Sequence, residues 1–305
     1  MKRFLLLFAV AILFAGCQKF KGDVTVPAFI HLDRIEVVSS GSGESVRPEG
    51  WFTSDIDAVQ LIALFPGSSK ETNLGVFQLP CTVPALTTGN ATYIRVVPVI
   101  RQNGLAATRI EYPFFRDTTF YDVPLVPDST TCLGRPDADG RYTVNVCYKS
   151  PSVISQKFFE DFEPLAAGIH FTSNVVTRVI GDSACTGSGY GRIVTPDTLA
   201  NAYFEITDSI VVTSPGAYLY LEMDYRTDVE LRIGLRSPIT QGGNDYSYDA
   251  ISLYPTKKWT KIYINLGKVW SQMNHYNTFH VYFKTLNINA KGGVTHLDNV
   301  KIITL

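Results

Sequence analysis

Short stretches in which apolar and polar residues alternate, each closed by turn residues, recur along the chain. The stretch 28–37 alternates with a period of two, which is the repeat of a β-strand with one buried face. Pro66-Gly67 and Asn103-Gly104 are turn pairs between such stretches, and an Asn-Gly pair favours a tight hairpin. No helical periodicity of useful length appears in residues 27–128. The chain is therefore expected to be all-β.

The spacing of these stretches predicts two β-sandwich domains. Short strands with Pro and Gly turns at regular intervals are typical of sandwiches, and 305 residues suit about two domains of roughly 100–200 residues each. The expected organisation is a first sandwich over residues 27–127, a linker over 128–152 and a second sandwich over 153–305.

The stretch 217–225 shows the alternation clearly. Leu221 and Met223 share one face of the predicted strand, whereas Glu222 and Asp224 lie on the other. Two carboxylates on one face could serve a glycosidase, but acidic residues two apart more commonly form a solvated or ion-paired face. We favour the second interpretation.

Charge and motifs argue against two function classes. Lys and Arg total 27, Asp and Glu total 28, and no basic cluster is present, so a nucleic-acid partner is not expected. The chain has no G-x-S-x-G and no H-E-x-x-H pattern, and its five His residues are scattered. We therefore expect a protein that is not an enzyme.

The first residues indicate export. Lys2 and Arg3 precede an apolar run at 4–14 that is too short for the roughly 20 residues of a membrane-spanning helix. This pattern is typical of a secretory signal peptide, expected over residues 1–16.

Export would place the cysteines in a compartment where disulfides can form. An even set of four remains in the exported part of the chain if Cys17 is set aside, which suggests disulfides with three possible connectivities. Cys132 and Cys147 bracket a short loop-like segment and are the preferred pair. The alternative is a set of buried thiols.

The segment Phe14-Ala15-Gly16-Cys17 resembles the lipobox of bacterial lipoproteins. The resemblance implies lipid attachment at Cys17, a tether over residues 17–26 and anchoring to a membrane. Gln18, in place of Asp, resembles lipoproteins that are sent on to the outer membrane. Whether the chain faces the periplasm or the cell surface stays open.

Three motifs in the first half, at residues 27–33, at 77–80 with 83–84, and at 103–104 followed by 112–114, resemble small immunoglobulin-like modules of lipoproteins in the Bacteroidetes phylum. The resemblance implies an immunoglobulin-like fold and a location in the cell envelope, without a known activity.

Four motifs in the second half, at residues 161–163, 221–225, 259–266 and 297–302, resemble the galactose-binding-like jelly roll of many carbohydrate-binding modules and envelope proteins. In such modules a calcium ion often joins the first strand to the last. The matching positions are Glu163 and Asp298, so a structural calcium is the one cofactor considered. An ordinary hydrogen-bonded strand end is the alternative.

Aromatic residues near expected loops are candidates for sugar binding, because exposed rings cover the apolar faces of sugars. These candidates are Tyr246, Tyr248, Trp270 and Tyr276, with packing against the core or at an edge as the alternative; Trp259 begins an alternating stretch and is expected in the core. The function expected is a non-catalytic membrane-anchored lipoprotein that binds a glycan or an envelope protein. The alternative is a structural subunit of an outer-membrane or surface assembly.

Overall fold

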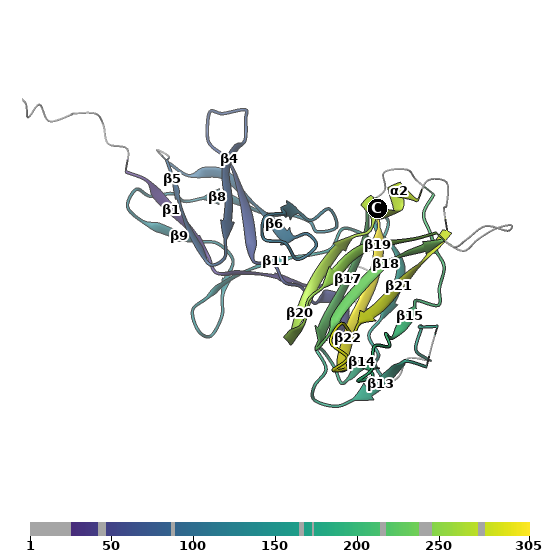
Figure 1. Cartoon of the computed structure of the whole chain (residues 1–305). Coiled ribbons are helices and arrows are strands. Elements are labelled where there is room, and N and C mark those ends of the chain that lie inside the picture. Colours follow the sequence, from purple (N-terminus) through teal and green to yellow (C-terminus); the bar gives the residue numbers. More distant parts are fainter. Residues whose placement is uncertain are drawn as a thin grey trace, which may run out of the picture.

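The computed structural model shows two all-β domains that lie against each other (Figure 1). It describes residues 26–41, 47–86, 89–164, 168–172, 174–213, 218–237, 246–273 and 278–305. The predicted all-β class with two sandwiches is confirmed. The signal peptide, Cys17 and Tyr276 lie outside the described residues. Within the described ranges, no helix has the length and apolar character needed to cross a membrane.

The first domain packs a five-stranded sheet against two three-stranded sheets, and the buried side chains of all three form one core. The larger sheet contains β4 (Thr72–Gln78), β3 (Ala58–Leu64), β6 (Ala91–Arg101), β7 (Arg109–Glu111) and β8 (Thr118–Val123). The smaller sheets are β5 (Cys81–Ala85), β1 (Ala28–Leu32) and β9 (Thr130–Cys132), and β10 (Arg135–Pro136), β11 (Tyr142–Val146) and β2 (Arg34–Val37). A 3-10 helix, η1 (Glu49–Phe52), follows β2 along the chain.

The segment expected as a linker, residues 128–152, is largely part of this first domain. β9 pairs in parallel with β1, and β11 pairs in parallel with β2. Gly134 lies between them at φ +97°, where a Cβ would stand 2.2 Å from the carbonyl oxygen of Thr143. The predicted boundary at residue 127 is therefore wrong, because Val144 and Val146 are buried in the first core.

The second domain is a sandwich of a six-stranded and a five-stranded sheet. The six-stranded sheet contains β13 (Val176–Ile180), β14 (Gly189–Thr195), β22 (Gly293–Thr304), β17 (Leu219–Thr227) and β20 (Thr256–Asn265), with β12 (Ser155–Glu160) paired to β22. The five-stranded sheet contains β15 (Tyr203–Glu205), β21 (Thr278–Leu286), β18 (Glu230–Ser237) and β19 (Tyr246–Leu253), with β16 (Ile210–Val211) paired to β21. A short helix, α2 (Gly267–Gln272), packs against β18 and β19.

The first domain covers the outer face of the six-stranded sheet at β17, β20 and β22. Tyr220, Tyr263 and Ile303 of these strands belong to the core of the first domain. The expected hairpin turn at Asn103-Gly104 is confirmed, with φ angles of 55° and 70°. This turn packs on β20, where the backbone N–H of Asn103 donates to the backbone carbonyl of Tyr263 at 2.8 Å. The two domains are thus joined by shared packing and by main-chain hydrogen bonds.

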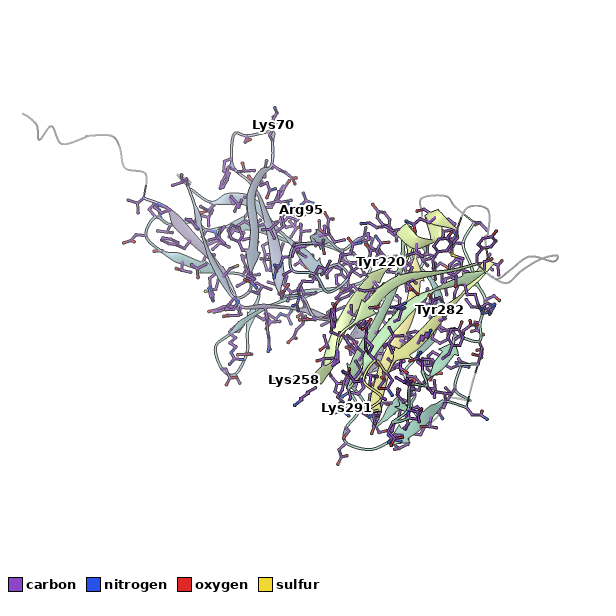
Figure 2. The ribbon with its side chains drawn as sticks, in the orientation of Figure 1. Lys70, Arg95, Tyr220, Lys258, Tyr282 and Lys291 are labelled. Carbon is purple, nitrogen blue, oxygen red and sulfur yellow. The ribbon has the colours of Figure 1, made fainter. Side chains whose placement is uncertain are left out.

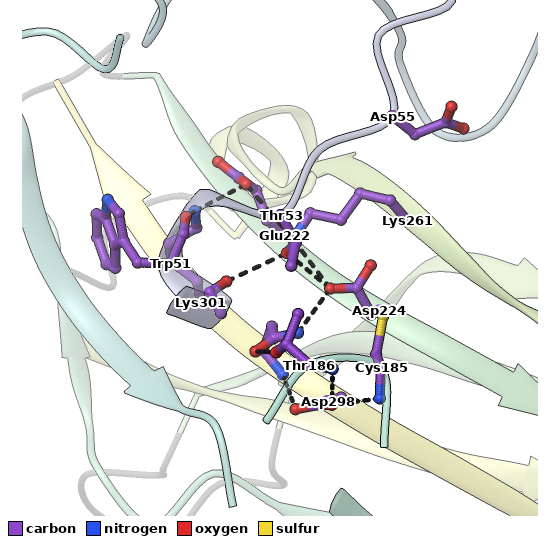
Figure 3. Close-up of polar contacts among 12 residues, drawn as sticks. Trp51, Thr53, Asp55, Cys185, Thr186, Glu222, Asp224, Lys261, Asp298 and Lys301 are labelled. Carbon is purple, nitrogen blue, oxygen red and sulfur yellow. Dashed lines mark hydrogen bonds and ion pairs between the residues drawn. The ribbon is translucent and has the colours of Figure 1, made fainter. Parts of the chain in front are cut away.

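Ionisable side chains are buried at the same junction (Figure 3). The carboxylate of Glu222, which is fully buried, accepts hydrogen bonds from the hydroxyls of Tyr112 and Tyr148, each at 2.8 Å. Lys301 Nζ lies 3.0 Å from Glu222 Oε2 and donates to the carbonyl of Trp51 at 2.9 Å. Burial lowers the pKa of Lys301 to about 7, against the opposing effect of Glu222. Glu222 therefore connects both domains through partners from each.

The neighbouring acid, Asp224, is held in the same way. It accepts a hydrogen bond from the Thr53 hydroxyl at 2.7 Å and from the Asn299 amide at 3.0 Å, and Lys261 Nζ lies 3.5 Å away. The favoured interpretation of an ion-paired face is correct for both carboxylates. The face is covered by the first domain, so Glu222 is fully buried and Asp224 is only 3% exposed, and both carboxylates face lysine side chains.

Candidate functional site

Glu163 and Asp298, the pair considered for calcium, hold opposite ends of the loop at residues 185–189. Asp298 accepts backbone N–H bonds from Cys185 and Thr186 at 2.9 and 3.3 Å. Glu163 accepts N–H bonds from Ser188 and Gly189 at 2.8 and 2.9 Å, and a third hydrogen bond from the Ser188 hydroxyl. Burial raises the pKa of Asp298 to about 8, although its backbone donors act in the opposite direction.

These carboxylates do not fit a calcium ion. Calcium takes six to eight oxygen ligands, whereas the groups that face both carboxylates here are mainly N–H donors. Within the described ranges, no three or more His, Cys, Asp and Glu side chains gather where they could hold a metal. The arrangement matches the alternative, a hydrogen-bonded strand end.

The preferred disulfide is not formed. Cys132 and Cys147 are both thiols in the structure. Cys132 lies opposite His31 in the pairing of β9 with β1, whereas Cys147 follows β11, which pairs with β2. The two cysteines thus follow different strand pairings, because the segment between them folds as part of the domain.

Three of the four predicted aromatic residues lie among the described residues, on β19 and α2. Tyr246 and Tyr248 lie on the edge strand β19 and are exposed. Trp270 lies on α2 and packs, partly buried, against the core of the second domain. Trp259 was expected in the core but is half-buried on the outer face of the six-stranded sheet, where Nε1 donates to the carbonyl of Ser183 at 2.9 Å. Tyr246, Tyr248 and Trp270 therefore lie on two neighbouring elements of the second domain, because α2 packs against β19.

A better organised surface lies on the outer face of the five-stranded sheet, around Tyr282 (Figure 2). The rings of Tyr203 on β15 and Tyr282 on β21 are nearly parallel, with centroids 5.8 Å apart and planes at 22°. Tyr203 is 45% exposed, whereas Tyr282 is buried. The two rings thus form a supported aromatic platform that is open to solvent at Tyr203.

Gly234 on β18 makes room for this platform. A Cβ at Gly234 would lie 2.4 Å from Cζ of Tyr282 and 2.3 Å from the carbonyl oxygen of Tyr248. Glycine therefore allows the Tyr282 ring to lie close over the sheet, so that its hydroxyl can donate to Asp249.

Replacing Gly234 with alanine should lower the free energy of unfolding by about 1–3 kcal/mol, because the added methyl meets both a ring and a backbone atom. Urea denaturation followed by circular dichroism measures the change. Gly181→Ala is the matched control, since a Cβ there meets no atom within 4 Å. Equal stability of the two variants would contradict the role of Gly234.

Charged groups are fixed beside the two rings. Arg236 donates from Nε and Nη2 to the two carboxylate oxygens of Glu205 at 2.5 and 2.6 Å. The hydroxyl of Tyr203 also donates to Glu205. On the other side of the platform, Arg232 Nη1 donates to Asp249 at 2.9 Å. Both carboxylates are therefore oriented by an arginine and a tyrosine each.

The ionisation states follow from these contacts. Burial acts to raise the pKa of Glu205, but hydrogen bonds from Arg236 and Tyr203 outweigh it, so the pKa lies below its usual value. Burial, followed by the hydrogen bond to Glu205, raises the pKa of Tyr203 above its usual value. At neutral pH the surface thus presents a neutral phenol, a carboxylate and a guanidinium in fixed positions.

The platform was missed in the sequence because its parts give no periodic signal. Tyr203 and Glu205 belong to a strand of three residues, which is too short for alternation to be recognised. Arg232, Gly234 and Arg236, at every second position of one strand, are the signal that was available, since they share a face.

Comparisons with known proteins give structural likenesses only. No protein-family model matches the chain, and no curated protein matches it. Among solved structures, it is similar to a family 11 carbohydrate-binding module from Clostridium thermocellum in complex with a β-1,3-1,4-mixed-linked tetrasaccharide. That match has a TM-score of 0.34 and 17% identity, and it covers 49% of this chain and 95% of the module.

Two further solved structures match with similar TM-scores and sequence identities. A family 30 carbohydrate-binding module of a Clostridium thermocellum cellulosomal cellulase matches with a TM-score of 0.36 and 14% identity, over 49% of this chain and 96% of the module. The enzymatically active domain of a bacteriophage CBA120 tailspike protein matches with a TM-score of 0.35 and 16% identity, over 58% of this chain and 25% of that protein. Since all three TM-scores lie below 0.5, these likenesses carry no ligand or activity over to this chain.

Proposed function

We propose that this chain is a non-catalytic glycan-binding protein, and that the outer face of the five-stranded sheet is its sugar-contacting surface. The observation that supports this proposal is the exposed ring of Tyr203, backed by Tyr282 and flanked by Glu205 and Arg236. Sugar sites combine an apolar surface with a few precisely placed polar groups, and this face offers both. An aromatic ring can cover the C–H face of a pyranose while the carboxylate accepts hydrogen bonds from its hydroxyls.

The proposal includes attachment to the outer membrane through lipid on Cys17. The lipobox-like segment at residues 14–17 supports it. A protein held at a membrane by a tether over residues 17–26 would present its sugar surface to polysaccharide at the cell envelope. Metabolic labelling with a clickable fatty acid tests this part separately, because Cys17→Ala should abolish the label.

Replacing Tyr203 with alanine should weaken binding of a neutral oligosaccharide by about tenfold, which corresponds to roughly 1.4 kcal/mol. The loss arises because the exposed ring provides the stacking surface. Isothermal titration calorimetry against neutral oligosaccharides from host and plant polysaccharides measures it, with the mixed-linked β-glucan tetrasaccharide among the probes.

Tyr121→Ala is the matched control, since Tyr121 is an exposed tyrosine on the first domain. Its affinity should equal that of the unmodified protein. Unchanged affinity in Tyr203→Ala would move the sugar site elsewhere. Failure of the unmodified protein to bind any oligosaccharide of the panel would favour the structural-subunit alternative.

A further inference from the structure

A cleft lies where the two domains meet, on the opposite side of the second sandwich from the tyrosine platform. The cleft there has a volume of about 700 Å3. The first domain contributes residues 53–55 and Arg101, and the second contributes residues 256–261 and Asp224. Neither domain encloses the cleft alone, and ligand sites occur preferentially at such domain interfaces.

The acidic groups of the cleft are already paired with cations. Arg101 donates to Asp55 at 2.6 Å. Asp224 faces Lys261 at 3.5 Å and accepts a hydrogen bond from Thr53, as Figure 3 shows. The charges of Arg101 and Asp55 offset each other, as do those of Lys261 and Asp224.

Two further lysines supply uncompensated positive charge. Lys257 and Lys258 are exposed near the start of β20 and line the cleft. Neither forms an ion pair with an acidic residue within the described part of the chain. Figure 2 labels Lys258, the third residue of β20. The cleft therefore has an excess of about two positive charges and favours an anion.

An aromatic side chain, Trp259, lines the cleft next to these lysines. Its indole is fixed by the hydrogen bond to Ser183 and by Arg226, whose guanidinium carbon lies 5.2 Å from the ring centroid. The hydroxyls of Thr256 and Thr260 are 3.3 Å apart in the same cleft. An anion with an apolar ring face and hydroxyl groups matches this combination better than a simple ion does.

We propose that the junction cleft binds a carboxylate-bearing saccharide, that is, a uronate unit. Lys257 and Lys258 receive the carboxylate, the indole of Trp259 contacts the sugar ring, and the threonine hydroxyls bind its hydroxyls. The proposal goes beyond the neutral-sugar surface described above, because it concerns another surface and another charge class of ligand.

The test uses trigalacturonate as the probe, with galactotriose as its neutral counterpart. Calorimetry should show tighter binding of trigalacturonate, and the affinity should fall as salt is raised from 50 to 500 mM, because exposed charges are screened. The double variant Lys257→Gln/Lys258→Gln should bind trigalacturonate about five- to tenfold more weakly, since each exposed charge contributes modestly. Lys257→Arg/Lys258→Arg should retain binding.

The matched control is Lys70→Gln/Lys268→Gln, which removes two exposed lysines. Lys70 lies on the first domain away from Lys258 (Figure 2), and Lys268 lies on α2, which follows the opposite end of β20. It should bind like the unmodified protein. Equal losses in both glutamine pairs, or unchanged affinity in the cleft pair, would overturn the proposal. Equally tight binding of a short polyglutamate peptide would overturn the assignment to a saccharide.

One more variant separates this proposal from the proposed function. Tyr203→Ala should keep full affinity for trigalacturonate while it loses neutral oligosaccharides. If Tyr203→Ala lost both ligands, a single surface would serve both, and the junction site would be refuted. If trigalacturonate binds and no neutral sugar does, the junction site stands and the tyrosine platform fails.

Discussion

Replacement of Glu222 with alanine should lower the free energy of unfolding by about 3–5 kcal/mol. The carboxylate is fully buried and accepts hydrogen bonds from Tyr112 and Tyr148 while it faces Lys301 at 3.0 Å. Its removal takes away the group that opposes the low pKa of Lys301, so that the buried amine loses its proton, and it leaves two hydroxyl donors without their acceptor. Both losses are costly because water cannot reach these groups. Urea denaturation followed by circular dichroism measures the effect.

Two companion variants show that the effect arises from the buried pair. Glu111→Ala removes an exposed glutamate beside Tyr112 and should change stability by no more than about 0.5 kcal/mol. Glu222→Leu/Lys301→Met should regain part of the loss, because it removes the buried amine together with its counter-ion, whereas the hydroxyls of Tyr112 and Tyr148 stay without their acceptor. If Glu222→Ala were as stable as Glu111→Ala, the proposed role of the carboxylate in joining the domains would be wrong.

Replacement of Trp51 with alanine should cost about 3–5 kcal/mol of unfolding free energy, as expected for a fully buried large aromatic residue. Trp51 belongs to η1 of the first domain and packs against Phe159 of β12 at a ring distance of 5.4 Å. Lys301 Nζ lies 4.4 Å from the same ring. Truncation would leave a cavity between the domains and remove the cation–π contact. Differential scanning calorimetry should show the lower melting temperature.

Trp51→Phe is the informative control. Nε1 of Trp51 is buried and has no hydrogen-bond partner among the described residues, so the indole N–H contributes no bond that phenylalanine would lose. We expect Trp51→Phe to cost under about 2 kcal/mol. A cost equal to that of Trp51→Ala would show that the shape of the indole, and not the buried ring as such, stabilises the junction.

The alternating pattern of β17 predicted the arrangement of its side chains but not their surroundings. Leu221 and Met223 enter the core of the second domain, as their alternation indicated, whereas Tyr220 enters the core of the first. The alternating sequence pattern around Glu222 would be the same whether water or another domain covered this face of the strand. Its partner Tyr112 lies 110 positions away, and local periodicity contains no information about such a contact.

The strands β9 and β10 and the tyrosine platform could not be recognised in the sequence for a related reason. β9 is three residues long and β10 is two, so neither repeats often enough to reveal a period of two. The same holds for the three-residue strand that contains Tyr203. Tyr246 and Tyr248 were recognised as candidates, but their position on an edge strand depends on how β18 and β19 pair. Short elements are specified by their neighbours in space, which the sequence pattern does not name.

The docking of the Asn103-Gly104 turn on β20 has a consequence for how this protein can evolve. A separated second sandwich would expose Tyr220, Tyr263 and Ile303 as an apolar patch, and such patches promote self-association. Gene rearrangements that transfer one sandwich without the other would therefore yield a poorly soluble product. We therefore expect the two domains to be inherited together, because the residues of the junction are buried only when both are present.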